Sequence, residues 1–141
     1  MYRIVCLLGL VASCLCFAGC STQGVASSDI EGAQAAFDAA KPMMESGDYA
    51  SALPLLTQAL DEVGLDPDQA TTAMLYRSIC HSTAGNTEAA EADIAEAEMG
   101  GPSEGLLVFA KAHAAEASGN SAEATKLFKS ARRLDSSLKK K

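Results

Sequence analysis

Residues 85–97 read GNTEAAEADIAEA, with Gly85, Ala90 and Ala97 spaced five and then seven residues apart. The same spacing occurs twice more, at Gly47, Ala52 and Ala59 and at Gly119, Ala124 and Ala131. The glycines of the first two copies are 38 residues apart, and those of the last two are 34 apart. A period in this range indicates stacked helical units. Such stacks usually serve as binding surfaces, so the spacing already favours binding over catalysis.

Length and composition favour one all-α domain. The chain has 141 residues, which is enough for a single domain. Apolar residues make up 48% of it but aromatic residues only 5%, because alanine supplies much of the apolar content. Such a chain buries area through close contacts between helices rather than through bulky core side chains. We therefore predict an all-α fold.

Charge is divided unevenly along the chain, whose formal net charge is −7. Residues 20–110 contain two basic and fifteen acidic residues, a net charge of −13. Residues 111–141 contain eight basic and three acidic residues, a net charge of +5. This asymmetry bears on partners and solubility, not on the fold.

The first twenty residues have the three parts of a secretory signal. Met1-Tyr2-Arg3 carries a positive charge, residues 4–17 carry none, and Ala18-Gly19 supplies the small residues of a cleavage site. The uncharged stretch of fourteen residues is shorter than the roughly 20 that a membrane-spanning helix needs. We predict a signal peptide over residues 1–19.

The segment Phe17-Ala18-Gly19-Cys20 resembles the lipobox of bacterial lipoproteins. The resemblance implies cleavage before Cys20, a diacylglycerol on its sulfur and acylation of the new N-terminus. Cys14 fits the lipobox letters slightly better, but it would leave a very short apolar segment. Cys16 follows Leu15, where the peptidase of that family needs a small residue. Cys20 is therefore the predicted lipidated residue, and the alternative is a plain signal peptide and a soluble secreted protein.

A lipidated Cys20 has consequences for location. One acyl chain anchors only marginally, whereas two or three hold a protein on a membrane, since each buried methylene contributes about 0.8 kcal/mol. Ser21 after the cysteine resembles the pattern sorted to the outer membrane of Gram-negative bacteria. We therefore expect a protein of the bacterial cell envelope, membrane-anchored and facing the periplasm. Nucleic acid is not an expected partner for an exported protein with this acidic balance.

A short polar stretch separates Cys20 from the predicted domain. Residues 20–29 have the composition of a flexible tether. Ser28 and Glu31 have the spacing of a capping box, which predicts the start of the first helix near residue 30. The helical domain is expected over residues 30–138 and a basic tail over 139–141.

Around each copy of the opening spacing, further residues resemble the tetratricopeptide repeat. With the three glycines at its fifteenth position, the family's small positions hold Ala40, Ser78 and Ala112; Ala52, Ala90 and Ala124; and Ala59, Ala97 and Ala131. Its large apolar twenty-fourth position holds Leu56, Ile94 and Phe128. Each glycine precedes Asp or Asn, which suits a helix end followed by a cap. The resemblance covers residues 33–136 and implies a short solenoid of three helix–turn–helix repeats, at about 33–70, 71–104 and 105–138.

The sequence also departs from the family pattern. The usual leucine at the seventh position is replaced by Ala39, Arg77 and Lys111. The usual aromatic residue at the fourth position is replaced by Ala36, Met74 and Val108. Pro42 falls inside the first predicted helix, where it costs about 3 kcal/mol unless the helix kinks. The first repeat is therefore expected to be the least regular.

The family resemblance also implies a binding face. In this family the first helix of each pair lines a concave groove, and the matching residues here include Phe37, Lys41, Leu75, Ile79, Phe109 and His113. Their apolar members predict a groove for a helix or an extended segment of another protein. A clamp for a C-terminal carboxylate is not expected, because Lys41 is the only residue of the required type. The alternative is that these residues pack the stack.

No residues of the sequence suggest catalysis or a cofactor beyond the covalent lipid on Cys20. His81 and His113 lack ligand spacing, so no metal is predicted, and Cys80 is expected to be a buried free thiol. No nucleophile–base pair or phosphate loop occurs. The leading hypothesis is a non-enzymatic adaptor that binds another protein. The alternative is a structural protein that forms homo-oligomers, with the basic last helix docking on the acidic repeats of another copy.

Overall fold

The computed structural model describes residues 27–139, and this part of the chain is all-helical, as the composition predicts. Its six helices are α1 (Ser27–Ser46), α2 (Tyr49–Asp61), α3 (Pro67–Thr83), α4 (Thr87–Met99), α5 (Glu104–Ala117) and α6 (Ser121–Leu134). The predicted signal peptide, Cys20 and the first part of the predicted tether lie outside the described residues. Helix α1 begins before the predicted start near residue 30, so Ser28 is inside the helix rather than at its N-cap.

Three short turns, of two or three residues, reverse the chain in the same way. Gly47, Gly85 and Gly119 have φ angles of 83°, 81° and 81°, in the left-handed region that favours glycine. Each glycine N–H donates to a carbonyl three residues earlier, and the next N–H donates to one five residues earlier. This is the Schellman pattern that ends a helix. The recurring glycines of the sequence therefore mark three equivalent helix ends.

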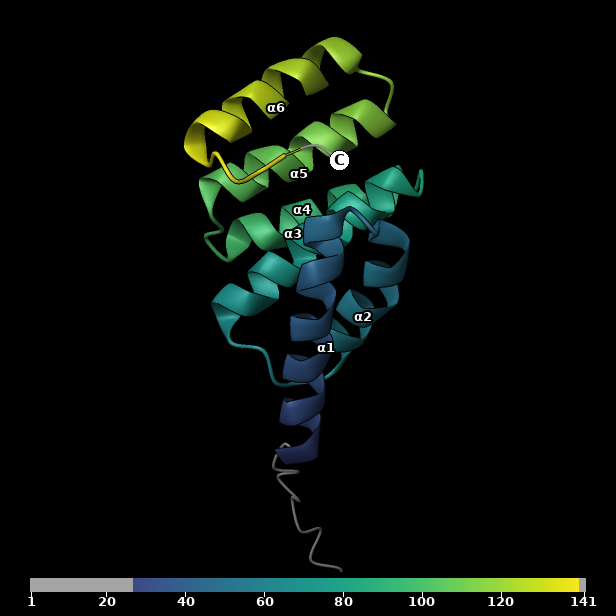
Figure 1. The fold of residues 1–141 in the computed structure, drawn as a ribbon, viewed down its shortest axis with the longest axis vertical. Helices are drawn as coiled ribbons and strands as arrows, with labels where there is room; N and C mark the ends of the chain where they lie inside the picture. Colours follow the sequence, from purple (N-terminus) through teal and green to yellow (C-terminus); the bar gives the residue numbers. More distant parts are fainter. Residues whose placement is uncertain (1–26, 140–141) are drawn as a thin grey trace, which may run out of the picture.

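The turns join the helices into the pairs α1/α2, α3/α4 and α5/α6, each of which packs along its length (Figure 1). The nine small residues are at most 3% exposed; they are Ala40, Ser78, Ala112, Ala52, Ala90, Ala124, Ala59, Ala97 and Ala131. Small side chains at these places let two helix backbones approach closely. The alanine content therefore lies where the helices meet.

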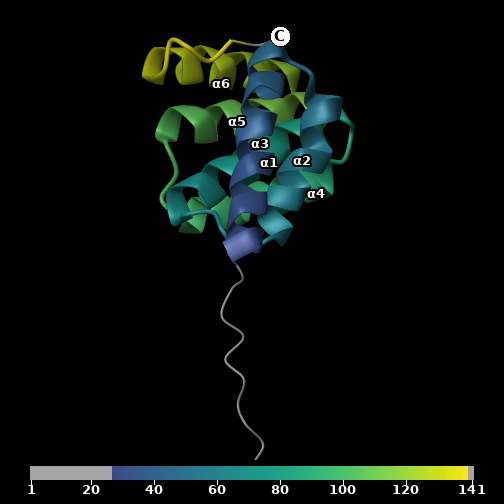
Figure 2. The same cartoon turned by 60° about the horizontal axis from the view of Figure 1, so that its bottom comes forward.

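The pairs do not stack on one another in the same way. Helix α3 packs mainly against α2 of the first pair, whereas α5 packs more on α3 than on α4. Figures 1 and 2 show α1 running steeply across the direction of α5 and α6. The first pair is thus turned relative to the other two.

The linker between the first two pairs ends in a helix cap. Helix α3 begins at Pro67, four residues before the predicted start of the second repeat at about residue 71. Asp66 caps this helix by accepting from the Gln69 N–H at 2.8 Å, and the Gln69 side chain accepts from the Asp66 N–H at 3.3 Å. Pro67 occupies the first helical position, which needs no N–H. The 62–66 linker is one residue longer than the 100–103 linker, and α3 is three residues longer than α5, which together account for the four extra residues between Gly47 and Gly85.

Helix α1 is continuous from Ser27 to Ser46 and includes Pro42. Pro42 is exposed, so water can reach the backbone carbonyl that lacks its usual partner. The proline therefore does not end the helix.

Both charged departures from the family pattern form ion pairs with α4. Arg77 Nε and Nη2 donate to the two carboxylate oxygens of Asp93 at 2.9 and 2.6 Å, with side-chain exposures of 20% and 7%. Hydrogen bonding to Asp93 raises the pKa of Arg77. Lys111 pairs with Glu98 at the surface between α5 and α4. Arg77 and Lys111 therefore take on a role between helices where the family pattern has leucine.

The chain turns back after the last helix. The carboxylate of Asp135 accepts from the N–H of Ser137 at 2.9 Å and from its hydroxyl at 2.6 Å. These hydrogen bonds lower the pKa of Asp135. Residues 135–139, called the C-terminal segment below, then run across α5 toward the C-terminal end of α1 (Figures 1 and 2). The Leu138 side chain packs against the core cluster of α3 to α6.

Candidate functional site

The predicted groove residues are mostly buried. Five are 6% exposed or less: Phe37, Leu75, Ile79, Phe109 and His113. Lys41 is half-buried. Apolar side chains at these positions pack between neighbouring helices, which removes them from solvent. These five residues are therefore part of the packed interior and do not form a free surface.

One cavity of the described residues lies where α1, the start of α2, α3 and α5 meet the C-terminal segment. Its volume is about 410 Å³. It is lined by Met44, Glu45, Tyr49, Tyr76, Ile79, Leu106, Phe109, Ser137, Leu138 and Lys139. We call the part contributed by the helices, Met44 to Phe109 in this list, the groove. Of the predicted residues it brings together Ile79 and Phe109; the others lie elsewhere.

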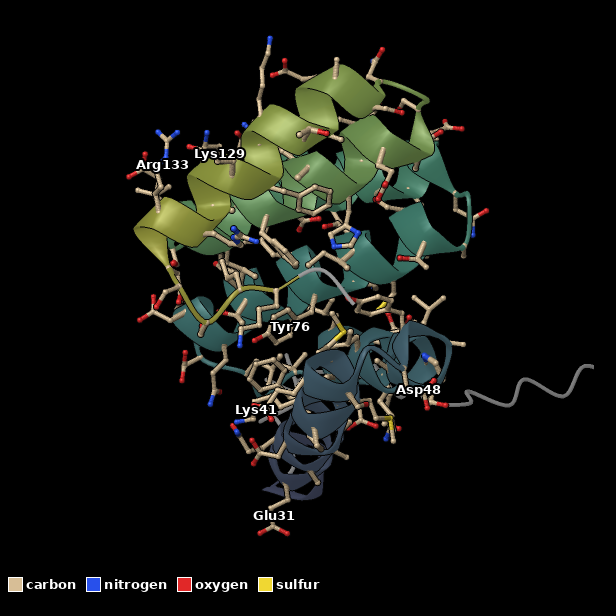
Figure 3. The ribbon with its side chains drawn as sticks, turned by 45° about the horizontal axis from the view of Figure 1, so that its top comes forward. Glu31, Lys41, Asp48, Tyr76, Lys129 and Arg133 are labelled. Atoms are coloured by element: carbon tan, nitrogen blue, oxygen red, sulfur yellow. The ribbon has the colours of Figure 1, made fainter. Side chains whose placement is uncertain are left out.

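Tyr76 lies at the centre of the groove, between α1 and the C-terminal segment (Figure 3). Glu45 of α1 and residues 137–139 of the C-terminal segment line the same cavity as the Tyr76 ring. Partial burial raises the pKa of its hydroxyl, and the negative charges of Glu45 and Asp135 add to the effect. The phenol therefore stays neutral and can donate a hydrogen bond at physiological pH.

Phe37 and Lys41 line a second cavity, at the start of α3, with a volume of about 580 Å³ and with residues 66–69 and Thr72 as its other walls. The Lys41 ammonium lies 2.7 Å from the Asp38 carboxylate and 5.1 Å from the centre of the Phe37 ring. Hydrogen bonding to Asp38 raises the pKa of Lys41. The charge of Lys41 is therefore already paired on its own helix.

His113 lies in an aromatic cluster. Its ring centre is 4.8 Å from that of Phe109, 5.0 Å from Phe128 and 5.9 Å from Tyr49, all edge to face. Tyr49 comes from the first pair, so this cluster connects α2 with α5 and α6. His113 is thus enclosed by rings and does not face the groove.

Cys80 is a buried free thiol that contacts the first pair. Its sulfur lies 3.5 Å from the sulfur of Met44. Burial raises the pKa of the thiol to about 12, which keeps it protonated. Within residues 27–139 no group of three or more His, Cys, Asp or Glu side chains could hold a metal ion. In the same part of the chain, each helix is too short or too polar to cross a membrane.

Sequence reasoning missed Tyr49, Tyr76 and the C-terminal segment. Tyr76 shares a helical face with Thr72 and Ile79, three or four residues away, and this spacing was available as a signal. Leu138 is a single aliphatic residue between two serines and three lysines. An isolated leucine in a polar tail is a weak signal, and nothing in the sequence indicates which surface it covers.

The chain was also compared with known proteins. No protein-family model, curated protein or solved structure matches it.

Proposed function

We propose that the protein is a lipid-anchored adaptor of the bacterial cell envelope, which offers the groove to a segment of another protein. The observation that carries the proposal is the composition of the groove. Helices from all three pairs contribute to it: α1 and the start of α2, α3, and α5. Tetratricopeptide-like stacks build binding surfaces in this way, from the first helices of successive repeats.

The repeat-like skeleton supports the same proposal. The three glycine turns have nearly equal φ angles and the same hydrogen bonds. The nine small residues predicted from the family pattern are buried between helices. We therefore propose that α1 to α6 form a short stack of three tetratricopeptide-like units. Its first unit is turned relative to the others.

The proposed anchor rests on the sequence around Cys20. Helix α1 begins at Ser27, so only residues 21–26 separate it from the lipidated cysteine. Six residues span at most about 20 Å when fully extended. An anchored protein would therefore keep its helices close to the membrane surface. We place that surface on the outer membrane, facing the periplasm.

The proposed role is non-enzymatic. Cys80 is buried with a raised pKa, and the His113 ring is enclosed by aromatic rings, so neither suits a nucleophile or a base. The groove floor is apolar, and the Lys41 charge is held by Asp38. This chemistry suits an apolar side chain of a partner better than its terminal carboxylate.

Crosslinking in the cell tests the groove. A photocrosslinking amino acid at Tyr76 should capture a discrete partner from the envelope. The matched control places the same amino acid at Ala92, which is exposed on α4 and outside the groove. Equal crosslinking from both positions, or none from Tyr76, would contradict an adaptor role for the groove.

Fatty-acid labelling tests the anchor. Cys20→Ser should abolish labelling and release the protein from the membrane fraction, whereas Cys14→Ser should change neither. If Cys14→Ser also abolishes labelling, the choice of Cys20 is wrong. If the wild-type protein takes up no fatty acid, the secreted alternative holds.

A second candidate function is self-association. Figure 3 shows Lys129 and Arg133 at one end of the molecule and Glu31 at the other, and all three are exposed. Opposite charges at the two ends favour head-to-tail assembly of copies. Such oligomers should dissociate at about 0.5 M salt, where screening is strong. Sedimentation that shows a monomer at low salt would rule this function out.

A further inference from the structure

The groove already has an occupant, which is the chain's own C-terminal segment. Leu138 lines the same cavity as Tyr76, Ile79 and Phe109. It also packs against the core cluster that contains Ile79, Leu106 and Phe109. The apolar floor is therefore covered by one aliphatic side chain from the end of the described chain.

The C-terminal segment begins with a hydrogen-bonded turn. Asp135 accepts hydrogen bonds from Ser137, and this turn directs the chain away from α6. Gly105, in the first turn of α5, lies next to Leu134 and Asp135. A Cβ atom at Gly105 would lie 3.1 Å from the Asp135 Cβ and 3.5 Å from the Leu134 Cβ. A side chain at this position would therefore need Asp135 to shift by a few tenths of an ångström.

The C-terminal segment contacts the groove through few side chains. Leu138 is the only aliphatic residue of the segment, and Ser136, Ser137 and Lys139 are exposed. Lys139 lines the same cavity as the Glu45 carboxylate on α1. The segment therefore presents an aliphatic side chain followed by a basic one.

From these contacts we propose that the C-terminal segment is a built-in competitor for the groove. The partner inserts an extended segment of the same chemistry, in which an aliphatic side chain replaces Leu138 and a basic residue follows it near Glu45. This inference rests on the adaptor function proposed above, and it names the partner's chemistry and the way access to the groove is regulated. A segment attached to the protein has a high effective concentration, so it keeps weak ligands out until a better one arrives.

Hydroxyl-radical footprinting of the full-length protein tests whether the C-terminal segment covers the groove. In Leu138→Asp the charged side chain should leave the groove, and hydroxyl-radical oxidation of Met44 and Tyr76 should rise several-fold. Ser136→Asp adds the same charge at an exposed neighbour and should leave both unchanged. Gly105→Ala should give a smaller rise, because the added Cβ needs Asp135 to shift by only a few tenths of an ångström. Circular dichroism checks that each variant keeps its helices. Unchanged oxidation in folded Leu138→Asp would overturn the proposal.

A peptide supplied in trans tests the chemistry of the occupant. The probe has the sequence of residues 135–141 and is followed by NMR, which detects millimolar binding. It should shift the signals of Tyr76 and Glu45 in Leu138→Asp and have little effect on wild-type protein. Peptides carrying Leu138→Asp or Lys139→Glu should bind several-fold more weakly. Equal binding to both proteins, no binding to the opened variant, or equal binding by all three peptides would overturn the proposal.

Crosslinking separates the two proposals. With the photocrosslinker at Tyr76, Leu138→Asp should capture several-fold more partner than Ser136→Asp. If Leu138→Asp raises oxidation and peptide binding but the photocrosslinker at Tyr76 captures no partner, the adaptor function is contradicted. That result would leave intact the proposal that the C-terminal segment occupies the groove. If Tyr76 captures a partner equally in both variants, the adaptor function stands and the competition is wrong.

Discussion

The first helix pair and the two later pairs share the same turns and buried small residues but differ in the ion pairs that join their helices. All three have the glycine turn and the buried small residues. In the later pairs, two ion pairs reach α4: Arg77 joins α3 to it within the second pair, and Lys111 joins α5 to it between the second and third pairs. The matching residue of α1 is Ala39, an exposed alanine without charge. The difference teaches that buried small residues are common to all three pairs, whereas the ion pairs, one within the second pair and one between the second and third, are confined to the later pairs.

The junction between the first pair and the rest gives the largest expected effect, at Cys80. A pKa raised from 9.0 to about 12 lowers the thiolate fraction at neutral pH on the order of a thousandfold. Alkylation of the native protein, followed by mass spectrometry of the Cys80 peptide, should therefore be slower than in urea by at least that factor. Met44→Ala should speed it by opening the contact with α1. Fast alkylation of the native wild-type protein would mean that the first pair separates from α3.

The same thiol predicts a dependence on pH. Its folded pKa lies above its unfolded value, so burial of the neutral thiol stabilises the fold fully below pH 9. That contribution is lost as the pH rises from 9 toward 12. Urea unfolding should show a smaller alkaline loss of stability in Cys80→Ala than in the wild type. Parallel pH profiles would show that the thiol is not desolvated in the native state.

Within the later pairs, Arg77 gives the next effect. Arg77→Met leaves the buried Asp93 carboxylate without its partner and should lower the free energy of unfolding by about 3–5 kcal/mol. Lys111→Met removes an exposed ion pair and should cost no more than about 1 kcal/mol. Urea denaturation measures both. Equal costs would mean that burial does not distinguish the two ion pairs.

The shared skeleton can be tested in both regions. Ala90→Leu in α4 and Ala52→Leu in α2 should each cost roughly 1–3 kcal/mol, because both sites are fully buried between helices. Ala92→Leu, on the exposed side of α4, should cost far less. If Ala52→Leu is tolerated and Ala90→Leu is not, the first pair is more loosely packed than the others.

The turns give the smallest effect. Gly85→Ala should cost about 1–2 kcal/mol from its positive φ alone, because an added Cβ meets no atom within 4 Å. Gly85→Asn should cost less, since asparagine tolerates this conformation better. Gly47→Ala should match Gly85→Ala, because the two φ angles agree within a few degrees. A clear difference in thermal unfolding would show that the turns are not equivalent.

How far the sequence predicts the molecule depends on the range of the interaction. The glycine turns and the helical class follow from local rules, and the all-α prediction is confirmed. The start of α3 at Pro67 follows from a local signal as well, because Asp66 and Gln69 have the spacing of a helix cap. The partner of Arg77 could not be read from the sequence, because Asp93 is one of several carboxylates on α4.

The candidate site was harder to predict for a physical reason. Position in a helix predicts which face a side chain occupies, but not how closely the next helix approaches. Phe109 and Ile79 lie on the expected face and are nevertheless buried. Tyr76, one position away from the expected Leu75, lines the groove instead. The C-terminal segment reaches the groove through a turn at Asp135, and a five-residue polar stretch gives no sign of its target.

The path of the C-terminal segment also changes how the helices should unfold. A linear array of helix pairs normally frays from either end, because each pair touches only its neighbours. Here Leu138, which follows the last helix, shares a cavity with Met44 near the end of the first. The C-terminal segment therefore connects the last helix, α6, with the first, α1. Local unfolding of α1 should then be coupled to local unfolding of α6. Hydrogen exchange of α1 and α6 should then report a single cooperative unit, and Leu138→Gly should split it into two.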